Sequence, residues 1–231
     1  MNIIILIKPI PDLSKIKVSR GQGQVFETGK RVMNPWDRTA LQVAVDLKQS
    51  HGGSVNAISL CRAEDSEILR EAYAIGVDNC YQLTDPQFEG NDPYISAVVL
   101  SRAISRLGPF DLILCGAKSE VGFSGQIGPR VAEILNLRQA TSVLSLSIQG
   151  TAIVVSSMIK GNPIERTINL PALITVEQAI CQPKIPTAMM IMKAYKKTIV
   201  VWNANDLGFT AHEIGDSAAL TRVYSQYLVE A

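Results

Sequence analysis

The sequence lacks the features that mark several large classes of protein. Its 22 lysines and arginines balance 21 aspartates and glutamates, so the formal net charge of +1 gives no electrostatic reason to expect nucleic acid or an anionic membrane as a partner. The apolar run Ile3–Ile7 near the N-terminus is too short for a signal peptide or a membrane span. We therefore expect a protein of the cytoplasm that does not insert into membranes.

Paired cysteines and histidine clusters are missing as well. Cys61, Cys80, Cys115 and Cys181 lie far apart, with no CxxC motif and no histidine nearby. This spacing fits neither a zinc site nor a dithiol centre. We expect reduced thiols in or near the core, and no metal site.

What the sequence does contain, up to about residue 140, is a regular alternation of strand and helix signals. Apolar runs predict strands, and a proline directly after Asn34 and after Asp92 predicts that a helix begins at each. The predicted strands are residues 2–7, 54–60, 79–85 and 110–116, and the predicted helices are residues 34–53, 64–76, 92–108 and 125–137. The alternation predicts a Rossmann-like α/β fold, an open and mostly parallel sheet with helices on both faces.

The pattern changes after residue 140. Residues 141–159 alternate like a hairpin that turns at Gln149 and Gly150. Residues 164–176 give two more short strands, divided by Pro171. We expect these strands to extend the sheet in antiparallel fashion.

The chain has no internal repeat or low-complexity linker, so we expect one α/β domain with an appended segment. The domain is predicted to span residues 1–180. Residues 181–231 hold prolines, a methionine-rich tract and a weak helical pattern at their end. They are expected to form an extended arm.

The stretch CGAKSEVGFSGQIGPR, residues 115–130, is a candidate binding loop. It follows a buried strand, is rich in glycine and leads directly into a helix, but it has neither GxGxxG nor a lysine at the spacing of a P-loop. In open α/β sheets the loops after the first and fourth strands flank a ligand crevice, so Asn34 and this loop could face one cavity. Backbone N–H groups and the helix N-terminus could then hold a phosphate. The alternative is that the glycines serve tight turns only.

Several motifs in a fixed order resemble the beta subunit of electron transfer flavoproteins, and the resemblance covers nearly the whole chain. The motifs are, in chain order, IKPIPD (7–12), MNPWDRTALQVAVDLK (33–48), LREAYAIGVD (69–78), FDLILCGAKS (110–119), GQIGPRVAEILNL (125–137), LPALITVEQAICQPKIP (170–186) and IMKAYKK (191–197). The resemblance implies a noncatalytic electron carrier that shelves the FAD of an alpha subunit in a heterodimer. It implies electron exchange with a flavin-dependent dehydrogenase, and AMP or a second FAD bound to this chain.

The resemblance also implies which residues do this, and no catalytic residue is among them. The implied nucleotide contacts, many of them through the backbone, are Leu6, Asn34, Pro35, Trp36, Asp37, Leu60, Gly116, Ser119, Gly122, Phe123, Ser124, Gly125, Gln126 and Gly128. Residues 181–192, here called the docking segment, correspond to the family's partner-recognition loop. The implied docking residues are Cys181, Pro183, Ile185, Ala188, Met189, Met190 and Met192. We expect residues 181–231, the docking segment and the arm that follows it, to embrace the alpha subunit.

The sequence departs from the family pattern in both places. Val121 and Phe123 stand where many relatives have aspartates, and Ala188 stands where a bulky apolar anchor is common. Each implied site residue also has a structural explanation: Asn34 is a good helix cap, and Asp37 complements the helix dipole without a ligand. Gln126 could likewise cap its helix or face solvent.

A second function stays open at this point, a stand-alone adenine-nucleotide enzyme or a stress-type regulator that uses ATP. Such a protein needs a catalytic base or metal-binding acids beside the loop. Val121 and Phe123 are apolar at positions where those acids would be expected, which favours the electron carrier.

Overall fold

The protein is described by a computed structural model that covers residues 1–19, 24–27, 29–88, 92–210, 212–215 and 218–221, without the side chains of residues 17–28. Its main sheet has nine strands, which in spatial order are β11 (Asn162–Asn169), β10 (Ala152–Ile159), β9 (Arg138–Gln149), β12 (Ala172–Val176), β8 (Leu112–Gly116), β1 (Asn2–Leu6), β6 (Ser54–Leu60), β7 (Asn79–Leu83) and β13 (Ile199–Trp202). All neighbouring strands from β9 to β13 are parallel, whereas β10 is antiparallel to β9 and to β11. The predicted α/β class is confirmed.

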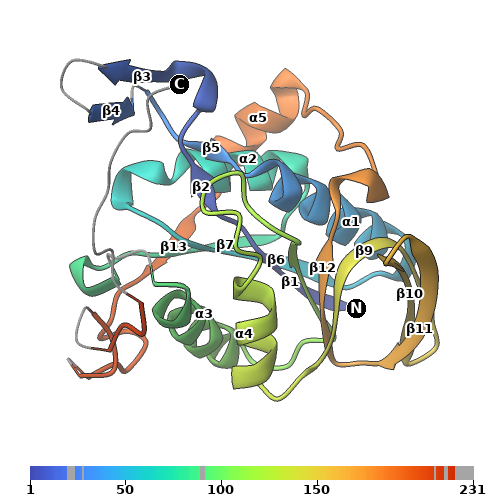
Figure 1. Cartoon of the computed structure of the whole chain (residues 1–231). Coiled ribbons are helices and arrows are strands. Elements are labelled where there is room, and N and C mark those ends of the chain that lie inside the picture. The colour runs from blue at the N-terminus through green and yellow to red at the C-terminus, as the bar shows by residue number, and fades with distance from the viewer. Residues whose placement is uncertain (20–23, 28, 89–91, 211, 216–217, 222–231) are drawn as a thin grey trace.

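Helices cover both faces of this sheet (Figure 1). They are α1 (Pro35–His51), α2 (Glu67–Ile75) and α5 (Ala188–Tyr195) on one face, and α3 (Pro93–Leu107) and α4 (Ile127–Ile134) on the other. Side chains of a strand point alternately to the two faces. In β1, Ile3 and Ile5 accordingly pack with α1 and α2, while Ile4 and Leu6 pack with α3 and α4.

The helix starts follow the sequence signals, with one exception. Pro35 and Pro93 are the first residues of α1 and α3, and the Asp92 carboxylate accepts hydrogen bonds from the N–H groups of Tyr94 and Ile95. Asn34 occupies the cap position of α1, but its side chain makes no cap hydrogen bond. Asn34 is therefore the N-cap residue as predicted, but its side chain does not cap the helix, because it is engaged with the loop 117–126.

The expectation that every strand after residue 140 extends the sheet in antiparallel fashion is wrong for β12. This strand lies between β8 and β9, runs parallel to both and is buried along its whole length. A continuous apolar run such as ALITV is typical of a central parallel strand. Pro171 precedes the strand, so the missing N–H of the proline removes no hydrogen bond from the sheet.

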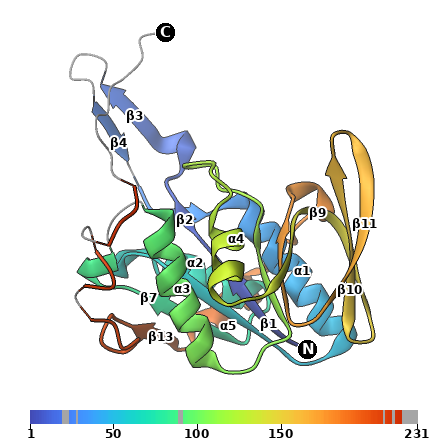
Figure 2. The same cartoon turned by 60° about the horizontal axis from the view of Figure 1, so that its bottom comes forward.

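The predicted hairpin is confirmed as β9 and β10, which turn at Gly150 with φ +61°. The next hairpin, β10 with β11, extends from the body of the molecule (Figure 2). Seven of the eight residues of the edge strand β11 are exposed. Exposed apolar side chains on this hairpin are Met158, Ile159 and Ile164.

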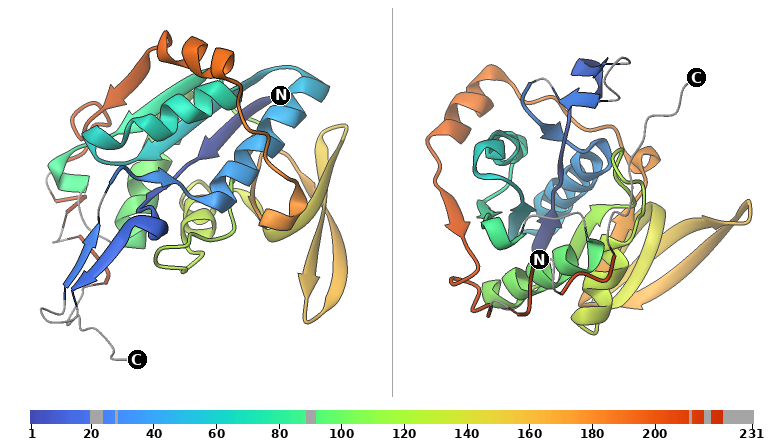
Figure 3. Two further views of the ribbon diagram at one scale, coloured as in Figure 1. Left: turned by 90° about the horizontal axis from the view of Figure 1, so that it is seen from above. Right: turned by 60° about the vertical axis from the view of Figure 1, so that its left-hand side comes forward.

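Part of the predicted arm is integrated into the domain. α5 packs on α2, and β13 pairs in parallel with β7 at the far edge of the sheet (Figure 3). Trp202 packs against Tyr81 there, with ring centroids 4.8 Å apart. Beyond β13, Leu207 and Phe209 are buried with α3. The weak helical pattern at 219–231 lies mostly outside the described residues. That residues 181–231 embrace a partner stays a prediction.

The long connection from β1 to α1 forms two small antiparallel sheets. The first pairs β2 (Pro9–Ile10) with β5 (Val32–Met33), and the second pairs β3 (Ile16–Ser19) with β4 (Gln24–Glu27). Short 3-10 turns, η1 (Leu13–Lys15), η2 (Ala63–Asp65), η3 (Pro86–Phe88) and η4 (Gln178–Ile180), complete the connections. The β2–β5 pair returns the chain to the edge of the main sheet, where α1 begins.

Candidate functional site

The predicted binding loop lies at the point where the strand order of the sheet reverses. After β1 the chain builds β6 and β7 on one side of it and then crosses to place β8 on the other. β6, β1 and β8 are adjacent and parallel, so their carboxyl ends meet at one edge. This is the place where open α/β sheets bind ligands. Residues 117–126, here called the β8–α4 loop, leave the sheet at this edge.

Asp37, in the first turn of α1, ties the ends of β1 and β8 together. Its buried carboxylate accepts hydrogen bonds from the backbone N–H of Lys8, at 2.8 Å, and of Gly116, at 2.9 Å. Burial raises the pKa of Asp37 to about 6, and the two N–H donors oppose this shift. Both carboxylate oxygens face backbone rather than a ligand, so Asp37 supports the site from beneath.

Asn34 holds the β8–α4 loop from below. The side chain is only 1% exposed; its Nδ2 donates to the carbonyl of Lys118 at 2.9 Å, and its Oδ1 accepts from the N–H of Glu120 at 3.3 Å. The Lys8 ammonium donates to the carbonyl of Val121 at 3.0 Å. Partial burial lowers the pKa of Lys8, and the Asp37 carboxylate opposes that shift. The predicted meeting of Asn34 and the loop is thus a direct contact.

The glycines of this region serve two different purposes. A Cβ on Gly116 would lie 2.4 Å from Cβ of Trp36, and one on Gly128 would lie 2.5 Å from Cγ2 of Thr175, so both allow close packing. Gly122 and Gly125 have φ of +87° and +63°, which L residues rarely adopt. The turn interpretation therefore fits Gly122 and Gly125, whereas Gly116 and Gly128 are packing residues, which that interpretation did not include, and the N–H of Gly116 is already bonded to Asp37.

The later part of the loop presents free donors. Within the described part of the chain, the backbone N–H groups of residues 122–128 donate to no protein acceptor. They lead into the first turn of α4, whose N-terminus carries partial positive charge. A row of unpaired N–H groups at a helix N-terminus fits a phosphate.

The two unusual residues of the loop have different surroundings. Phe123 is 58% exposed and meets the Trp36 ring edge to face, with ring centroids 5.9 Å apart. The Lys118 ammonium lies 4.5 Å from the centroid of Phe123 and 5.3 Å from that of Trp36. Val121 lies at the turn of the loop, above Lys8. An aromatic and cationic cluster therefore flanks the free N–H groups.

The remaining residues implied as nucleotide contacts lie around this edge. Leu6 and Leu60 end β1 and β6 and pack in the core, so only their backbones are available there. Gln126 precedes α4 without capping it, because its Oε1 accepts two hydrogen bonds from the Arg130 guanidinium at 2.9 and 3.0 Å. The other three are Pro35 at the start of α1, the exposed Ser124, and Ser119, whose hydroxyl accepts from the N–H of Val121.

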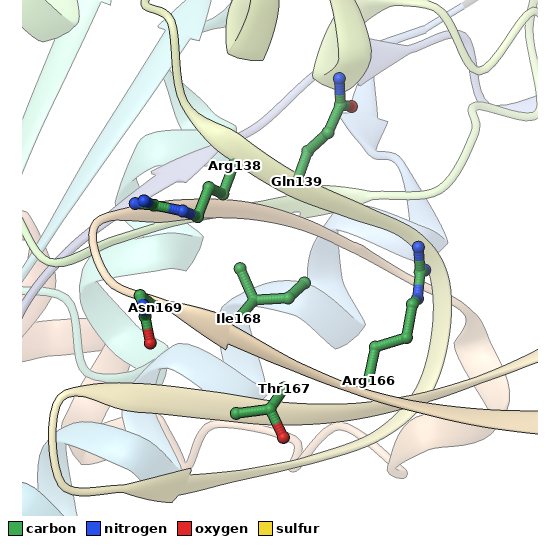
Figure 4. Close-up of a pocket in the computed structure, with 6 residues that line it drawn as sticks. All are labelled: Arg138, Gln139, Arg166, Thr167, Ile168 and Asn169. Carbon is green, nitrogen blue, oxygen red and sulfur yellow. The ribbon is translucent and has the colours of Figure 1, made fainter.

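A shallow hollow elsewhere on the sheet is not part of this site. It is lined by Arg138, Gln139, Arg166, Thr167, Ile168 and Asn169 (Figure 4). Arg138 pairs with Ala172 at the start of β12, whereas Gly116 pairs with Val176 at the other end of that strand. The hollow and the β8–α4 loop thus lie at opposite edges of the sheet.

Comparison with known proteins identifies the family. The sequence model of the electron transfer flavoprotein domain matches residues 22–207. The chain belongs to the electron transfer flavoprotein beta-subunit family. It is 32% identical to the electron transfer flavoprotein subunit beta of Thermoanaerobacterium thermosaccharolyticum, over 96% of this chain and 86% of that one.

Two further relatives carry other names. The caffeyl-CoA reductase-Etf complex subunit CarD of Acetobacterium woodii is 28% identical over 98% of this chain and 87% of its own length. Protein FixA of Sinorhizobium fredii is 31% identical over 90% of this chain and 76% of its own length. The resemblance inferred from the motifs is confirmed at the level of the family.

The docking segment of this beta subunit is anchored at one end and exposed at the other. Cys181 and Pro183 line a groove against α1, and the N–H of Lys184 donates to Oε1 of the buried Gln42 at 3.0 Å. From there on its apolar side chains are exposed: Ile185 is 91% exposed, Met189 66%, Met190 40% and Met192 68%. Thr187 caps α5, so Ala188 begins a helix where the resemblance suggested a loop.

Sequence reasoning missed three residues that the fold brings to the site. Lys8 lies two residues after the end of β1 and was a visible candidate; Lys118 and Glu177 gave no signal, and the latter accepts the indole N–H of Trp36 at 3.0 Å. Cys61, Cys80 and Cys115 are buried free thiols and Cys181 is half-buried.

Among the residues that the structure describes, no helix is both long and apolar enough to cross a membrane.

Proposed function

We propose that this chain forms a heterodimer with an alpha subunit, and that the complex passes electrons between a flavin-dependent dehydrogenase and a downstream acceptor. In this proposal the alpha subunit carries the redox-active FAD, which this chain shelves, and the β8–α4 loop holds AMP or a second FAD. The complex is expected in the cytoplasm. Family membership supports the carrier function over an enzyme or regulator that uses ATP.

The observation that carries the nucleotide proposal is the row of unpaired N–H groups at residues 122–128. These donors lie at the strand-order reversal and at the N-terminus of α4, where both the backbone and the helix dipole favour an anion. Asn34 and Asp37 fix the first half of the loop and the strand ends under it. The donors would therefore keep their positions without a large ordering cost on binding.

The chain's role in electron transfer is to bind and to orient. A bound flavin supplies the redox chemistry, and the protein supplies position and electrostatics. The backbone donors of the loop would bind the phosphate, while the Trp36 and Phe123 rings form an apolar flank beside it. No proton transfer or bond formation by a side chain of this chain is required.

The surface favours a large partner. The β10–β11 hairpin extends from the domain with Met158, Ile159 and Ile164 exposed, and β11 offers an unpaired strand edge. Exposed apolar side chains on a protruding hairpin are costly for a lone chain. They support an interface with the alpha subunit, and the docking segment remains for the dehydrogenase.

Coexpression with the alpha subunit tests the assembly and its cofactors. Analytical ultracentrifugation should give a 1:1 yellow complex, and this chain alone should be a poor monomer. The ratio of adenine to isoalloxazine, measured in an extract of the denatured complex, identifies the bound cofactors. One flavin with one AMP gives two adenines for each isoalloxazine, whereas two flavins give one. A colourless monomer that ignores the alpha subunit and hydrolyses ATP contradicts the proposal.

A charge placed in the β8–α4 loop tests the phosphate site directly. Ser124→Glu puts a carboxylate beside the free N–H groups, and we expect AMP affinity to fall by about two orders of magnitude because like charges repel in a partly dry site. Ser147→Glu, on an exposed position of β9, is the matched control. Unchanged adenine content and thermal stability in Ser124→Glu would mean that the loop does not hold a phosphate.

A further inference from the structure

Among the residues that the structure describes, three positive side chains along the β8–α4 loop make their hydrogen bonds and ring contacts with neutral groups. Lys8 donates to a backbone carbonyl, Lys118 lies against two aromatic rings, and Arg130 donates to the amide oxygen of Gln126. Within the described residues, none of the three lies within 4.0 Å of a carboxylate oxygen. These cations keep their charge available beside the free backbone N–H groups.

Two carboxylates near the loop are already engaged, and Glu120, in the loop itself, is exposed to solvent. Asp37 is buried and accepts two backbone N–H groups, and Glu177 accepts the indole N–H of Trp36. Position 123 holds an aromatic ring in this chain. An aspartate there would pair with Lys118 and cancel its charge, whereas the ring face attracts an ammonium without neutralising it.

Lys118 is the cation that the fold holds most specifically. Its ammonium lies over the rings of Trp36 and Phe123, which fix it at the open side of the loop. Among the described residues the ammonium donates no hydrogen bond to a protein oxygen or nitrogen, so its N–H donors can serve an oxygen acceptor once it leaves the rings. Phe123 keeps this position with φ +49°, a conformation that a bulky residue seldom adopts.

We propose that Lys118 is a phosphate-binding residue of the nucleotide site, and that Trp36 and Phe123 position it. The inference rests on the proposed function, because it takes the β8–α4 loop as the place where the nucleotide binds. Lys118 turns from the ring faces to a phosphate oxygen that the N–H groups of residues 122–128 also bind. The two aromatic rings then serve the lysine in the way that a carboxylate serves it elsewhere, but without competing with the phosphate.

Binding of AMP and of adenosine to the purified, nucleotide-stripped heterodimer tests this inference. Lys118→Met should weaken AMP binding by about tenfold or more, because one charge-assisted hydrogen bond is lost. Adenosine, which has no phosphate, should bind this variant and the unchanged protein alike. Lys118→Arg should keep AMP affinity within about threefold, since a cation remains. Arg138→Met, which removes a positive charge at the opposite edge of the sheet, is the control and should change the affinity for neither ligand.

Phe123→Asp provides a second variant that does not depend on removing the lysine. Aspartate tolerates positive φ better than phenylalanine does, so the loop should keep its shape. The new carboxylate should pair with Lys118 and weaken AMP binding about as much as Lys118→Met does. In the double variant, Phe123→Asp should weaken AMP binding little beyond the effect of Lys118→Met, because no lysine is left to pair with the new carboxylate. Only the repulsion between that carboxylate and the phosphate should remain.

The outcomes separate this inference from the proposed function. If Lys118→Met binds AMP like the unchanged protein, Lys118 is not a phosphate ligand and the inference is wrong, while the nucleotide site stands. If the unchanged protein binds adenosine as tightly as AMP, or binds neither AMP nor a second FAD, the loop does not recognise a phosphate and the proposed function itself fails. If Lys118→Met weakens adenosine and AMP equally, its effect is structural and the inference is overturned.

Discussion

The β8–α4 loop and the docking segment are both surface segments, but they are built in opposite ways. The loop rests on buried polar groups, Asn34 and Asp37, whose hydrogen bonds fix its backbone from below. The docking segment is held to α1 by polar contacts at Cys181 and Lys184, and then exposes methionine side chains on α5. A fixed backbone suits a ligand that stays bound, whereas a flexible apolar surface can repack on a partner that comes and goes.

The comparison predicts that changes beneath the loop cost stability, and that changes on the docking segment do not. The largest effect is expected for Gly116→Ala. The new Cβ would meet Cβ and the backbone of Trp36 and the Asp37 carboxylate, at 2.4 to 2.9 Å, and none of these can yield easily. We expect the free energy of unfolding to fall by about 3 kcal/mol, measured by urea titration of the heterodimer.

Gly122→Ala is the matched control for that variant. The new Cβ of this variant has open space around it, and only the φ of +87° is strained. The free energy of unfolding should therefore fall by about 1–2 kcal/mol. Equal losses for the two glycines would contradict the close packing of β8 against α1.

An intermediate effect is expected for Asp37→Asn. The amide offers one acceptor oxygen where the carboxylate offers two, so one of the N–H groups of Lys8 and Gly116 loses its partner, at a cost of about 1–3 kcal/mol. Asp111→Asn is the control, because that carboxylate accepts a backbone N–H at the other end of β1 in contact with solvent. The free energy of unfolding should fall less for Asp111→Asn than for Asp37→Asn.

The pH dependence of the Asp37 effect has a definite sign. The carboxyl has a pKa of about 6 in the folded protein against 3.8 as the ordinary value, so the folded state binds its proton more tightly. The unchanged protein should therefore lose stability, relative to Asp37→Asn, as the pH rises from about 4 to 6. The difference between the two proteins, measured by urea titration at several pH values, should shrink over this window. A growing difference would falsify the burial of an ionisable group at this position.

The smallest effect on stability is expected for Met189→Asp with Met190→Asp. Both side chains are exposed on α5, so the free energy of unfolding should change by less than about 0.5 kcal/mol. Flavin and adenine content should stay the same. Reduction of the complex by its dehydrogenase, followed by flavin absorbance, should slow markedly, because the apolar surface becomes charged. Loss of flavin together with electron transfer would mean that the segment is structural and not a docking surface.

Local signals in the sequence were sufficient for most of the helices and strands. Prolines after Asn34 and Asp92 marked helix starts, and apolar runs marked the strands of the parallel sheet. The same signals could not give the neighbours of β12, since an apolar run indicates a buried strand but does not say which strands lie beside it. They also missed β13, whose pairing with β7 joins residues more than a hundred positions apart.

At the candidate site, too, the sequence predicted some features and missed others. Motif order pointed to the family and to the β8–α4 loop, and strand-end reasoning brought Asn34 to that loop. The side-chain role of Asn34 was misjudged, because the cap signal is local while its true partners are 84 and 86 residues away. Lys118 could not be singled out, since one lysine in a loop has no pattern and gains meaning only from the rings beside it.

The sequence by itself determined the α/β class, the family, and the loop from which a nucleotide would be held. These three features depend on periodicity, on helix and turn residues and on ordered motifs, all of which can be read from the sequence without knowledge of contacts between distant residues. The tertiary structure alone decided that Asp37 would join two strand ends, that Gly116 must lack a side chain, and that Lys118 would lie between Trp36 and Phe123. Each of these depends on atoms brought into contact by the packing of α1 against β1 and β8, and local propensity carries no information about such distant neighbours.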